Sequence, residues 1–257
     1  MREGKTVGNY LVHEITPEVV VRIARAMPDL PPALDQQVER LWQTASERVS
    51  AGGAGQMFNG RVFSADLISP RLISGHLTEY RRVVAQIEQP DLFAVLGVRS
   101  FAVCGVLRCP DGVVIGQRHQ AAVYQAGMWQ LPPAGSVDAS AVAAHGTVDL
   151  RQQLLGELHE ELGLFQDEVE EPRPLCIVEH PGSHVTDCGF ELVTRLSGEA
   201  VLAAHRRAGN SEYQQLRVVP ESELPAVLAE LGEAIVPQAR EFLVWAGLTT
   251  RCPKSSR

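Results

Sequence analysis

The sequence predicts an α/β protein in which helices cover a mixed β-sheet, with a smaller α+β unit in front of it. Three observations support this fold class. Apolar and β-branched runs that are typical of strands recur through the second half of the chain. A helix with marked ends is expected among them at residues 149–162, and helical spacing returns at residues 223–248. The first 93 residues mix both kinds of spacing, so we expect them to form the smaller unit.

The composition narrows the function classes. The chain has 257 residues, 45% of them hydrophobic, which is enough to bury a sizeable core. Its net charge of -8 argues against a nucleic-acid or anionic-membrane partner, whose binding surface would be basic. The five cysteines are odd in number and scattered, so neither a disulfide framework nor a zinc ribbon is indicated. With no apolar run long enough to span a membrane, we expect a cytoplasmic protein.

The smaller unit is expected to alternate helices and strands. Residues 17–30 and 31–49 have the apolar spacing of helices. Glycines at residues 50–56 predict a linker, after which residues 57–69 alternate like a strand. Residues 76–89 are interpreted as a helix. The sequence thus divides into an extension at residues 1–93, a main domain at 94–248 and a tail at 249–257.

The main domain is expected to hold most of the strands. Residues 93–119 predict a strand pair joined at Pro110-Asp111-Gly112, because this composition is typical of a hairpin turn. Further strands are predicted at residues 174–182, 188–198 and 216–220, and the helical end at 223–248 is broken at Pro237.

The central helix has sequence signals at both ends. Asp149 is a good N-cap, and Gly163 stands where a left-handed residue would end the helix. Leucines recur every four residues between them and predict one buried stripe, at Leu150, Leu154, Leu158 and Leu162.

Three glutamates share a different face of this helix: Glu157, Glu160 and Glu161. Like charges at this spacing repel one another. One interpretation is a solvated helix face, which is the commoner meaning of such a pattern. The other is a cation site, because clustered carboxylates suit Mg²⁺ or Mn²⁺.

The surrounding motifs favour the cation site. The stretch "LPPAGSVD" (131–138), followed after an insertion by "GELHEELGL" (156–164), resembles the signature of the Nudix hydrolases. In that signature a glycine-bearing loop leads to a helix that reads Arg-Glu-apolar-x-Glu-Glu-x-Gly-apolar. The resemblance implies a Nudix α/β/α sandwich with a mixed sheet. It also implies Mg²⁺ or Mn²⁺ ligands at Glu157, Glu160 and Glu161, with a carbonyl from the Gly135 region, and Glu160 or Glu161 as the catalytic base.

Two positions depart from this signature. Gly156 replaces the arginine that normally orients a catalytic glutamate, and Val148 stands where an upstream glutamate is expected. The resemblance therefore leaves two functions open. One is metal-dependent hydrolysis of the diphosphate bond in a nucleoside diphosphate linked to another group. The other is a nucleotide-binding or regulatory module with little hydrolytic activity.

A second resemblance covers the front of the chain. The stretches "FNGRVF" (58–63), "LTEYRR" (77–82) and "LGVRSFAVCGVL" (96–107) are similar to the front half of eukaryotic Nudix proteins that hydrolyse UDP-glucose. This implies a small-molecule substrate such as a UDP-sugar. It also places Glu191 and Glu212 near the diphosphate, although each is equally consistent with a surface glutamate.

Two more residues are candidates for substrate binding. Arg118 ends a strand near the signature and is expected to hold a phosphate, the alternative being a solvated edge-strand arginine. Trp129 either stacks on a nucleobase or packs in the core. The sequence leaves a homodimer open.

Overall fold

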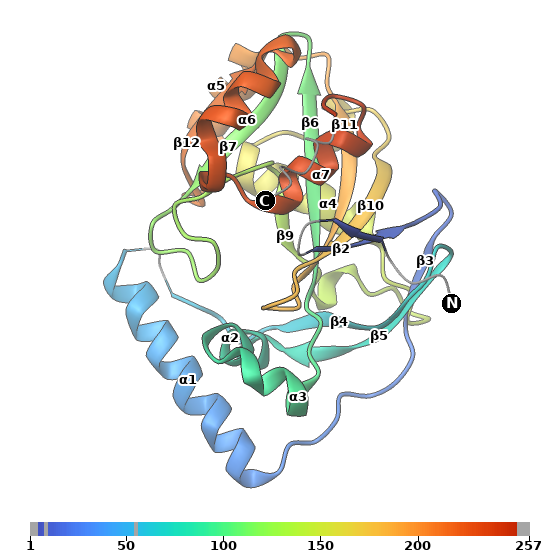
Figure 1. Cartoon of the computed structure of the whole chain (residues 1–257), viewed down its shortest axis with the longest axis vertical. Coiled ribbons are helices and arrows are strands. Elements are labelled where there is room, and N and C mark those ends of the chain that lie inside the picture. Colours follow the sequence, from blue (N-terminus) through green and yellow to red (C-terminus); the bar gives the residue numbers. More distant parts are fainter. Residues whose placement is uncertain (1–4, 8–9, 54–55, 251–257) are drawn as a thin grey trace, which may run out of the picture.

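The computed structural model describes residues 5–7, 10–53 and 56–250, so most of the predicted tail at 249–257 lies outside it. The chain forms a large mixed sheet covered by helices and a small second sheet (Figure 1). The predicted α/β fold with a mixed sheet is confirmed. No helix in the described residues is long and apolar enough to cross a membrane.

The large sheet has a path of seven strands and two short additions. Across the sheet the order is β1 (Lys5–Val7), β2 (Tyr10–Glu14), β10 (Arg173–Glu179), β11 (Thr186–Val193), β6 (Phe101–Cys109), β7 (Gly112–Arg118) and β12 (Tyr213–Val219). β11 and β6 run parallel, and the other pairs are antiparallel. β6 and β7 pair only beside their turn; further along, β6 pairs with β9 (Ala134–Ser136) and β7 with β8 (Trp129–Gln130). The central hairpin is therefore splayed at its open end.

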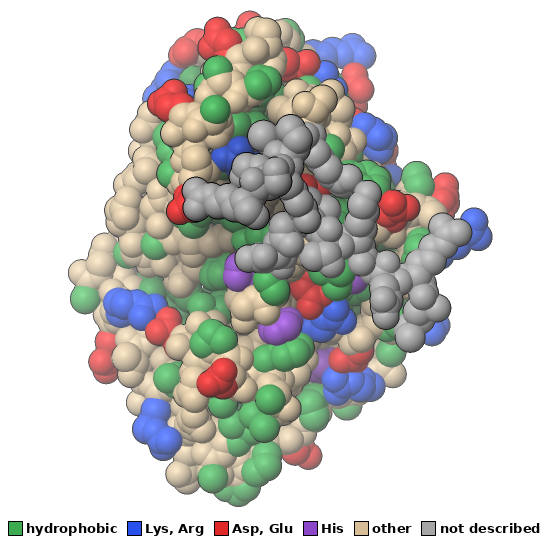
Figure 2. Space-filling view, viewed as in Figure 1, with side chains coloured by type: hydrophobic (Ala, Val, Ile, Leu, Met, Phe, Trp, Pro, Cys, Tyr) green, Lys and Arg blue, Asp and Glu red, His purple; other side chains and the backbone are tan. Residues whose placement is uncertain are grey.

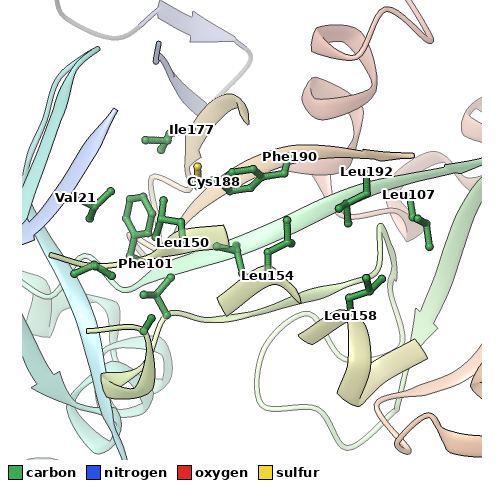
Figure 3. Packing of buried hydrophobic residues seen from close by; sticks show 14 of the residues in the cluster. Val21, Phe101, Leu107, Leu150, Leu154, Leu158, Ile177, Cys188, Phe190 and Leu192 are labelled. Carbon is green, nitrogen blue, oxygen red and sulfur yellow. The ribbon is translucent and has the colours of Figure 1, made fainter. Parts of the chain in front are cut away.

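Helices cover both faces of this sheet. On one face lie α4 (Leu150–Leu162) and α5 (Gly198–Ala208), and on the other α6 (Leu224–Leu231) and α7 (Pro237–Trp245). Figure 3 shows the α4 side chains Leu150, Leu154 and Leu158 directed at Phe190 and neighbouring apolar side chains of the strands. The two faces bury separate apolar clusters, so the large sheet is the middle layer of a sandwich.

The small unit lies below the large sheet in Figure 1. Its strands β3 (Val20–Ile23), β5 (Leu72–Glu79) and β4 (Arg61–Ile68) are adjacent in that order, and α1 (Pro32–Ala51), α2 (Tyr80–Glu88) and α3 (Phe93–Leu96) pack beside them. Single 3₁₀ turns occur at Pro90–Leu92, Ala139–Ala141, Gln166–Glu168, Glu221–Glu223 and Gly232–Ala234. Isolated bridges from Ser64 to Ser100 and from Val62 to Asp138 connect β4 to the main domain.

Several predicted elements are corrected. The helix predicted at residues 17–30 is wrong, because β3 occupies its centre and pairs with β5. The helix predicted at 76–89 begins only at Tyr80, since the preceding residues complete β5. α5 was not predicted. β1 and β2 come from the first 93 residues but belong to the large sheet.

Candidate active site

The structure confirms both predicted ends of α4. The Asp149 carboxylate accepts hydrogen bonds from the backbone N–H groups of Arg151 and Gln152, both at 3.0 Å. Gly163 has φ = 67°, a left-handed conformation that glycine adopts without the strain of a side chain. The buried leucine stripe fixes which face of the helix turns away from the sheet.

A cleft of about 580 Å³ opens beside the splayed end of the central hairpin. The large sheet and α4 provide one side of it, through residues that include Arg118, Gly135 and Glu157. The small unit provides the other, including Tyr80 and the exposed Phe58. This volume lies in the range of small-molecule sites. Acidic and basic side chains are interspersed over the face in Figure 2 rather than gathered into a basic patch.

One end of the cleft is acidic, and we call it the acidic pole. It consists of Glu157, Glu161, Glu212 and the backbone of Ala134–Gly135. A Cβ at position 135 would lie 2.0 Å from Glu157 Oε1, so glycine lets the strand β9 come this close to the carboxylate as it stands. The Ala134 N–H donates to Glu161 Oε2 at 3.0 Å. The other oxygen, Glu161 Oε1, is buried and has no hydrogen-bond partner in the described part of the chain.

The charges at the acidic pole are unfavourable as they stand. Burial and, after it, the charges of Glu212, Glu160 and Asp138 together raise the pKa of Glu157 to about 7, although a hydrogen bond from Gln153 opposes them. Burial, followed by repulsion from Glu212 and Glu157, raises the pKa of Glu161 well above its usual range. A cation placed here would relieve both the repulsion and the unsatisfied oxygen.

The three helix glutamates are not equivalent. Glu157 lines the cleft and Glu161 is fully buried behind it, whereas Glu160 is exposed. The described residues contain no group of three His, Cys, Asp or Glu side chains arranged to hold a metal ion. The donor set that fits a hard cation is thus Glu157 and Glu161 with the Gly135 region, and Glu160 lies on the solvent side of it.

Two polar side chains hold these glutamates in place of the missing arginine. Gln153 Nε2 donates to Glu157 Oε1 at 2.8 Å, and the Asp138 N–H fixes Gln153 Oε1 at 3.2 Å. The Tyr213 hydroxyl donates to Glu161 Oε2 at 3.2 Å. Gly156 itself is exposed. Both rotamers are therefore restrained without a cation from α4.

Arg118 connects the acidic pole to the rest of the cleft. It pairs with Glu212 at 3.0 Å and donates to Gln130 Oε1 at 3.0 Å. Its Nε–H is buried and has no partner among the described residues. Arg118 and Glu212 both line the cleft, as expected for residues that meet a ligand.

Two sequence candidates lie elsewhere. Trp129 is buried in the apolar cluster under α7, with the Arg217 guanidinium 4.4 Å from its ring centre, so it does not face the cleft. Glu191 is bound by Arg108 and Arg173, which keep the pKa of this carboxyl below its usual range although burial opposes them. Its strand brings Glu191 to the end away from the cleft, and we remove both residues from the candidate site.

Sequence reasoning missed three residues. Gln153 and Tyr213 carry no motif, and their roles depend on contacts with α4. Asp187, in the strand β11, is 9% exposed and lines the cleft, and its carboxylate makes no hydrogen bond to a described residue. An aspartate within a strand is uncommon, which is the one signal that the sequence offered.

Comparison with solved structures gives similarities at low identity. The chain is 15% identical to a Nudix hydrolase from Alicyclobacillus acidocaldarius, with 61% of this chain and 93% of that one covered and a TM-score of 0.41. A bifunctional NMN adenylyltransferase/ADP-ribose pyrophosphatase from Francisella tularensis, complexed with AMP and a Mn ion, is 12% identical over 63% of this chain and 45% of its own, with a TM-score of 0.42.

A third similar structure is NrtR from Shewanella oneidensis in complex with DNA, at 17% identity, with coverage of 57% of this chain and 59% of that one and a TM-score of 0.38. No protein-family model matches the sequence, and no curated protein does. At these identities and TM-scores, the chemistry of the site rests on the residues described above.

Proposed function

We propose that this protein hydrolyses the diphosphate bond of a nucleoside diphosphate linked to another group, with the help of a divalent cation. The observation that carries the proposal is the acidic pole. A fully buried carboxylate with an unsatisfied oxygen stands beside a second carboxylate and a strand that glycine brings into contact with it. Such an arrangement costs stability unless a ligand uses it.

The donor set fits Mg²⁺ or Mn²⁺ through oxygen ligands. Glu161 Oε1, the Glu157 carboxylate and a carbonyl of the Gly135 region would hold the ion. When bound, a divalent ion offsets the negative charge of a diphosphate and of the phosphate that leaves.

The chain's own groups then have separate tasks. Water attacks one phosphorus, and its proton passes to a carboxylate of the acidic pole, of which Glu157 lines the cleft directly. The bridging oxygen leaves with the second phosphate. Arg118 lines the cleft, and its guanidinium would donate to a phosphate oxygen.

The acidity of the pole also supports the metal dependence. Without a cation, a diphosphate would bring further negative charge to a pole whose carboxylates already repel one another. Hydrolysis is therefore expected only in the presence of the cation.

The test is an assay of the purified protein with Mg²⁺ and a substrate panel. The panel contains UDP-sugars first, then ADP-ribose, dinucleoside polyphosphates and nucleoside triphosphates. We expect one class to be cleaved into two phosphorylated products, and EDTA to stop the reaction. Glu161→Gln should lower turnover at least about 100-fold, the size of effect expected for loss of a group that stabilises the transition-state charge.

A matched control makes the same chemical change elsewhere. Glu230 is exposed on α6, far along the chain from the pole, and Glu230→Gln should keep full turnover. If the panel binds with Mg²⁺ but no member is cleaved, the chain is the nucleotide-binding or regulatory module instead. If nothing binds and nothing is cleaved, the proposed function is wrong.

A further inference from the structure

The cleft has a second polar feature, on β11, apart from the residues of the acidic pole. Asp187 is only 9% exposed, and it lines the cleft. Its carboxylate has no hydrogen-bond partner among the residues that the structure describes. Burial raises the pKa of Asp187 to about 7, against the opposing charge of Arg118. A nearly buried carboxylate that receives no hydrogen bond from a described residue can be satisfied by a ligand in the cleft.

Strand pairing gives the separation of Asp187 from the acidic pole. Asp187 in β11 is opposite Ala102 in β6, and Ala102 is opposite Ser136 in β9, next to Gly135. Residues opposite each other in a ladder point to the same face, so Asp187 shares the face of Ser136, whereas Gly135 is directed at Glu157 on the other face. Both faces border the cleft at the splayed end of the hairpin, where Ala102, Val103, Gly135 and Ser136 all line it. With neighbouring strands about 4.8 Å apart, Asp187 lies about 10 Å across the sheet from the backbone at the acidic pole. A ligand with its diphosphate at the pole spans this distance with the sugar attached to it.

The surroundings of Asp187 favour a neutral hydrogen-bond donor. Arg118 is close enough to act on the charge of Asp187, and it would repel a cationic ligand group. Tyr124, whose hydroxyl is 2.9 Å from Ser183 Oγ, lines the same region and supplies an apolar ring edge. A carboxylate can accept two hydrogen bonds side by side, which matches a pair of adjacent hydroxyls.

Another part of the cleft wall is held in an unusual conformation. Gln125 has φ = 52°, a left-handed conformation that a residue with a side chain rarely adopts. It exchanges hydrogen bonds with Gln238 of α7 at 3.3 and 3.1 Å, and both residues line the cleft. Strained backbone of this kind concentrates at ligand sites.

We propose that Asp187 determines specificity by accepting hydrogen bonds from a pair of adjacent sugar hydroxyls in the ligand whose diphosphate lies at the acidic pole. The inference rests on the proposed function for the position of the diphosphate. The hydroxyl pair belongs either to the ribose or to a sugar on the other side of the diphosphate.

The test measures equilibrium binding by calorimetry in the presence of Mg²⁺. In each compound a methylene group replaces the oxygen that bridges the two phosphorus atoms, so the protein cannot hydrolyse that link. Methylenediphosphonate reports on the acidic pole alone. Methylene-bridged UDP adds the ribose hydroxyls. Methylene-bridged UDP-glucose made with 2′,3′-dideoxyuridine carries hydroxyls only on the linked sugar.

We expect Asp187→Ala to weaken binding of at least one sugar-bearing compound about 10-fold or more, since hydrogen bonds to a charged group are the stronger kind. Its affinity for methylenediphosphonate should stay within about twofold of the wild type. Loss with methylene-bridged UDP alone assigns the ribose, and loss with the dideoxyuridine compound alone assigns the linked sugar. Asp187→Asn, which keeps the shape, should show the same direction of change and serves if the alanine variant does not fold.

Asp167→Ala is the matched control, because Asp167 is exposed in the turn after α4. Sugar-bearing compounds that bind the wild type and the Asp187 variants equally would overturn the proposal, and so would an equal loss with methylenediphosphonate. If the sugar-bearing compounds bind in a way that depends on Asp187 but methylenediphosphonate does not bind, the role of Asp187 in sugar binding stands and the proposed function is contradicted. Failure of all three compounds to bind would contradict both.

Discussion

Gly156 is an exposed glycine in the interior of α4, and nothing lies within 4 Å of the place where its Cβ would be. Glycine in a helix costs about 1 kcal/mol relative to alanine, because it loses more backbone freedom on folding. Gly156→Ala should therefore raise the free energy of unfolding by about 1 kcal/mol, measured by urea denaturation.

Gly163 provides a control about two turns further along, just past the end of α4. Its φ is 67°, and a Cβ there would lie 2.9 Å from the Ala204 carbonyl oxygen. Gly163→Ala should lower the free energy of unfolding by about 1 kcal/mol or more, since both strain and a clash arise. If Gly156→Ala is also destabilising, the added methyl group must meet another group at this exposed position, and the expectation is wrong.

The glutamates of the acidic pole are ordered although Gly156 departs from the Nudix signature. Glu157 and Glu161 are restrained by Gln153, Tyr213 and the Ala134 N–H, which come from one turn back on α4, from β12 and from β9. A side chain at position 156 is not required to hold them.

At the scale of elements, α4 depends on its first turn. The Asp149 carboxylate satisfies two backbone N–H groups that would otherwise lack partners. Asp149→Ala should lower the free energy of unfolding by about 1 kcal/mol, measured by chemical denaturation. Asp149→Asn keeps the capping oxygen and should cost much less. Equal losses in the two variants would mean that the charge of Asp149, not its cap, stabilises the helix.

Elements with local signals could be predicted, and elements defined by distant pairing could not. α4 was predicted to within a residue because its cap, its leucine stripe and its terminal glycine all act locally. β3 was mistaken for a helix because only its pairing with β5 holds those four residues extended. Likewise, the helix predicted at residues 76–89 includes the last residues of β5, because their extended conformation depends on pairing with β4.

The residues of the candidate site also divide into those with a local sequence signal and those without one. Glu157, Glu161 and Gly135 belong to motifs that are contiguous in sequence, and the structure brings them together. Arg118 and Glu212 were expected near them and form an ion pair. Gln153, Tyr213 and Asp187 could not be found, because their positions follow from the packing of β11, β12 and α4 rather than from any local pattern.

At the scale of the whole molecule, a buried ion cluster joins parts of the chain that are far apart in sequence. Glu179 of β10 is bound by Arg99, and its oxygens lie 3.2 Å from His184 Nδ1 and 3.5 Å from His13 Nε2. Burial alone would raise the pKa of Glu179, but hydrogen bonds and charges from His13, Arg99 and His184 outweigh it and lower the pKa to about 2.

This lowered pKa predicts how stability changes with pH. The unfolded chain takes up the proton near pH 4.5 and the folded chain only near pH 2, so the stabilisation is complete above pH 4.5 and is lost as the pH falls toward 2. Glu179→Gln should therefore lower the free energy of unfolding by up to about 3 kcal/mol at pH 7, and the difference from the wild type should shrink below pH 4.5. Denaturation curves at several pH values measure it.

An exposed ion pair serves as the comparison. Glu199 and Arg206 pair on the surface of α5, where Glu199 is 77% exposed. Glu199→Gln should change stability by less than about 1 kcal/mol. A difference for Glu179→Gln that stayed constant from pH 7 to pH 3 would show that lost packing, rather than the charge, is responsible.

The position of β2 has a consequence for any attempt to isolate the main domain. β2 pairs with β10, and the chain then passes through the small unit before it returns to the centre of the large sheet as β6. Removing residues 1–93 would strip β2 from β10 and leave an unpaired row of backbone N–H and C=O groups along a buried apolar strand. An uncovered edge of this kind recruits strands from other molecules. The shortened protein should therefore precipitate or form aggregates, and the first strands act as a protective border of the sheet.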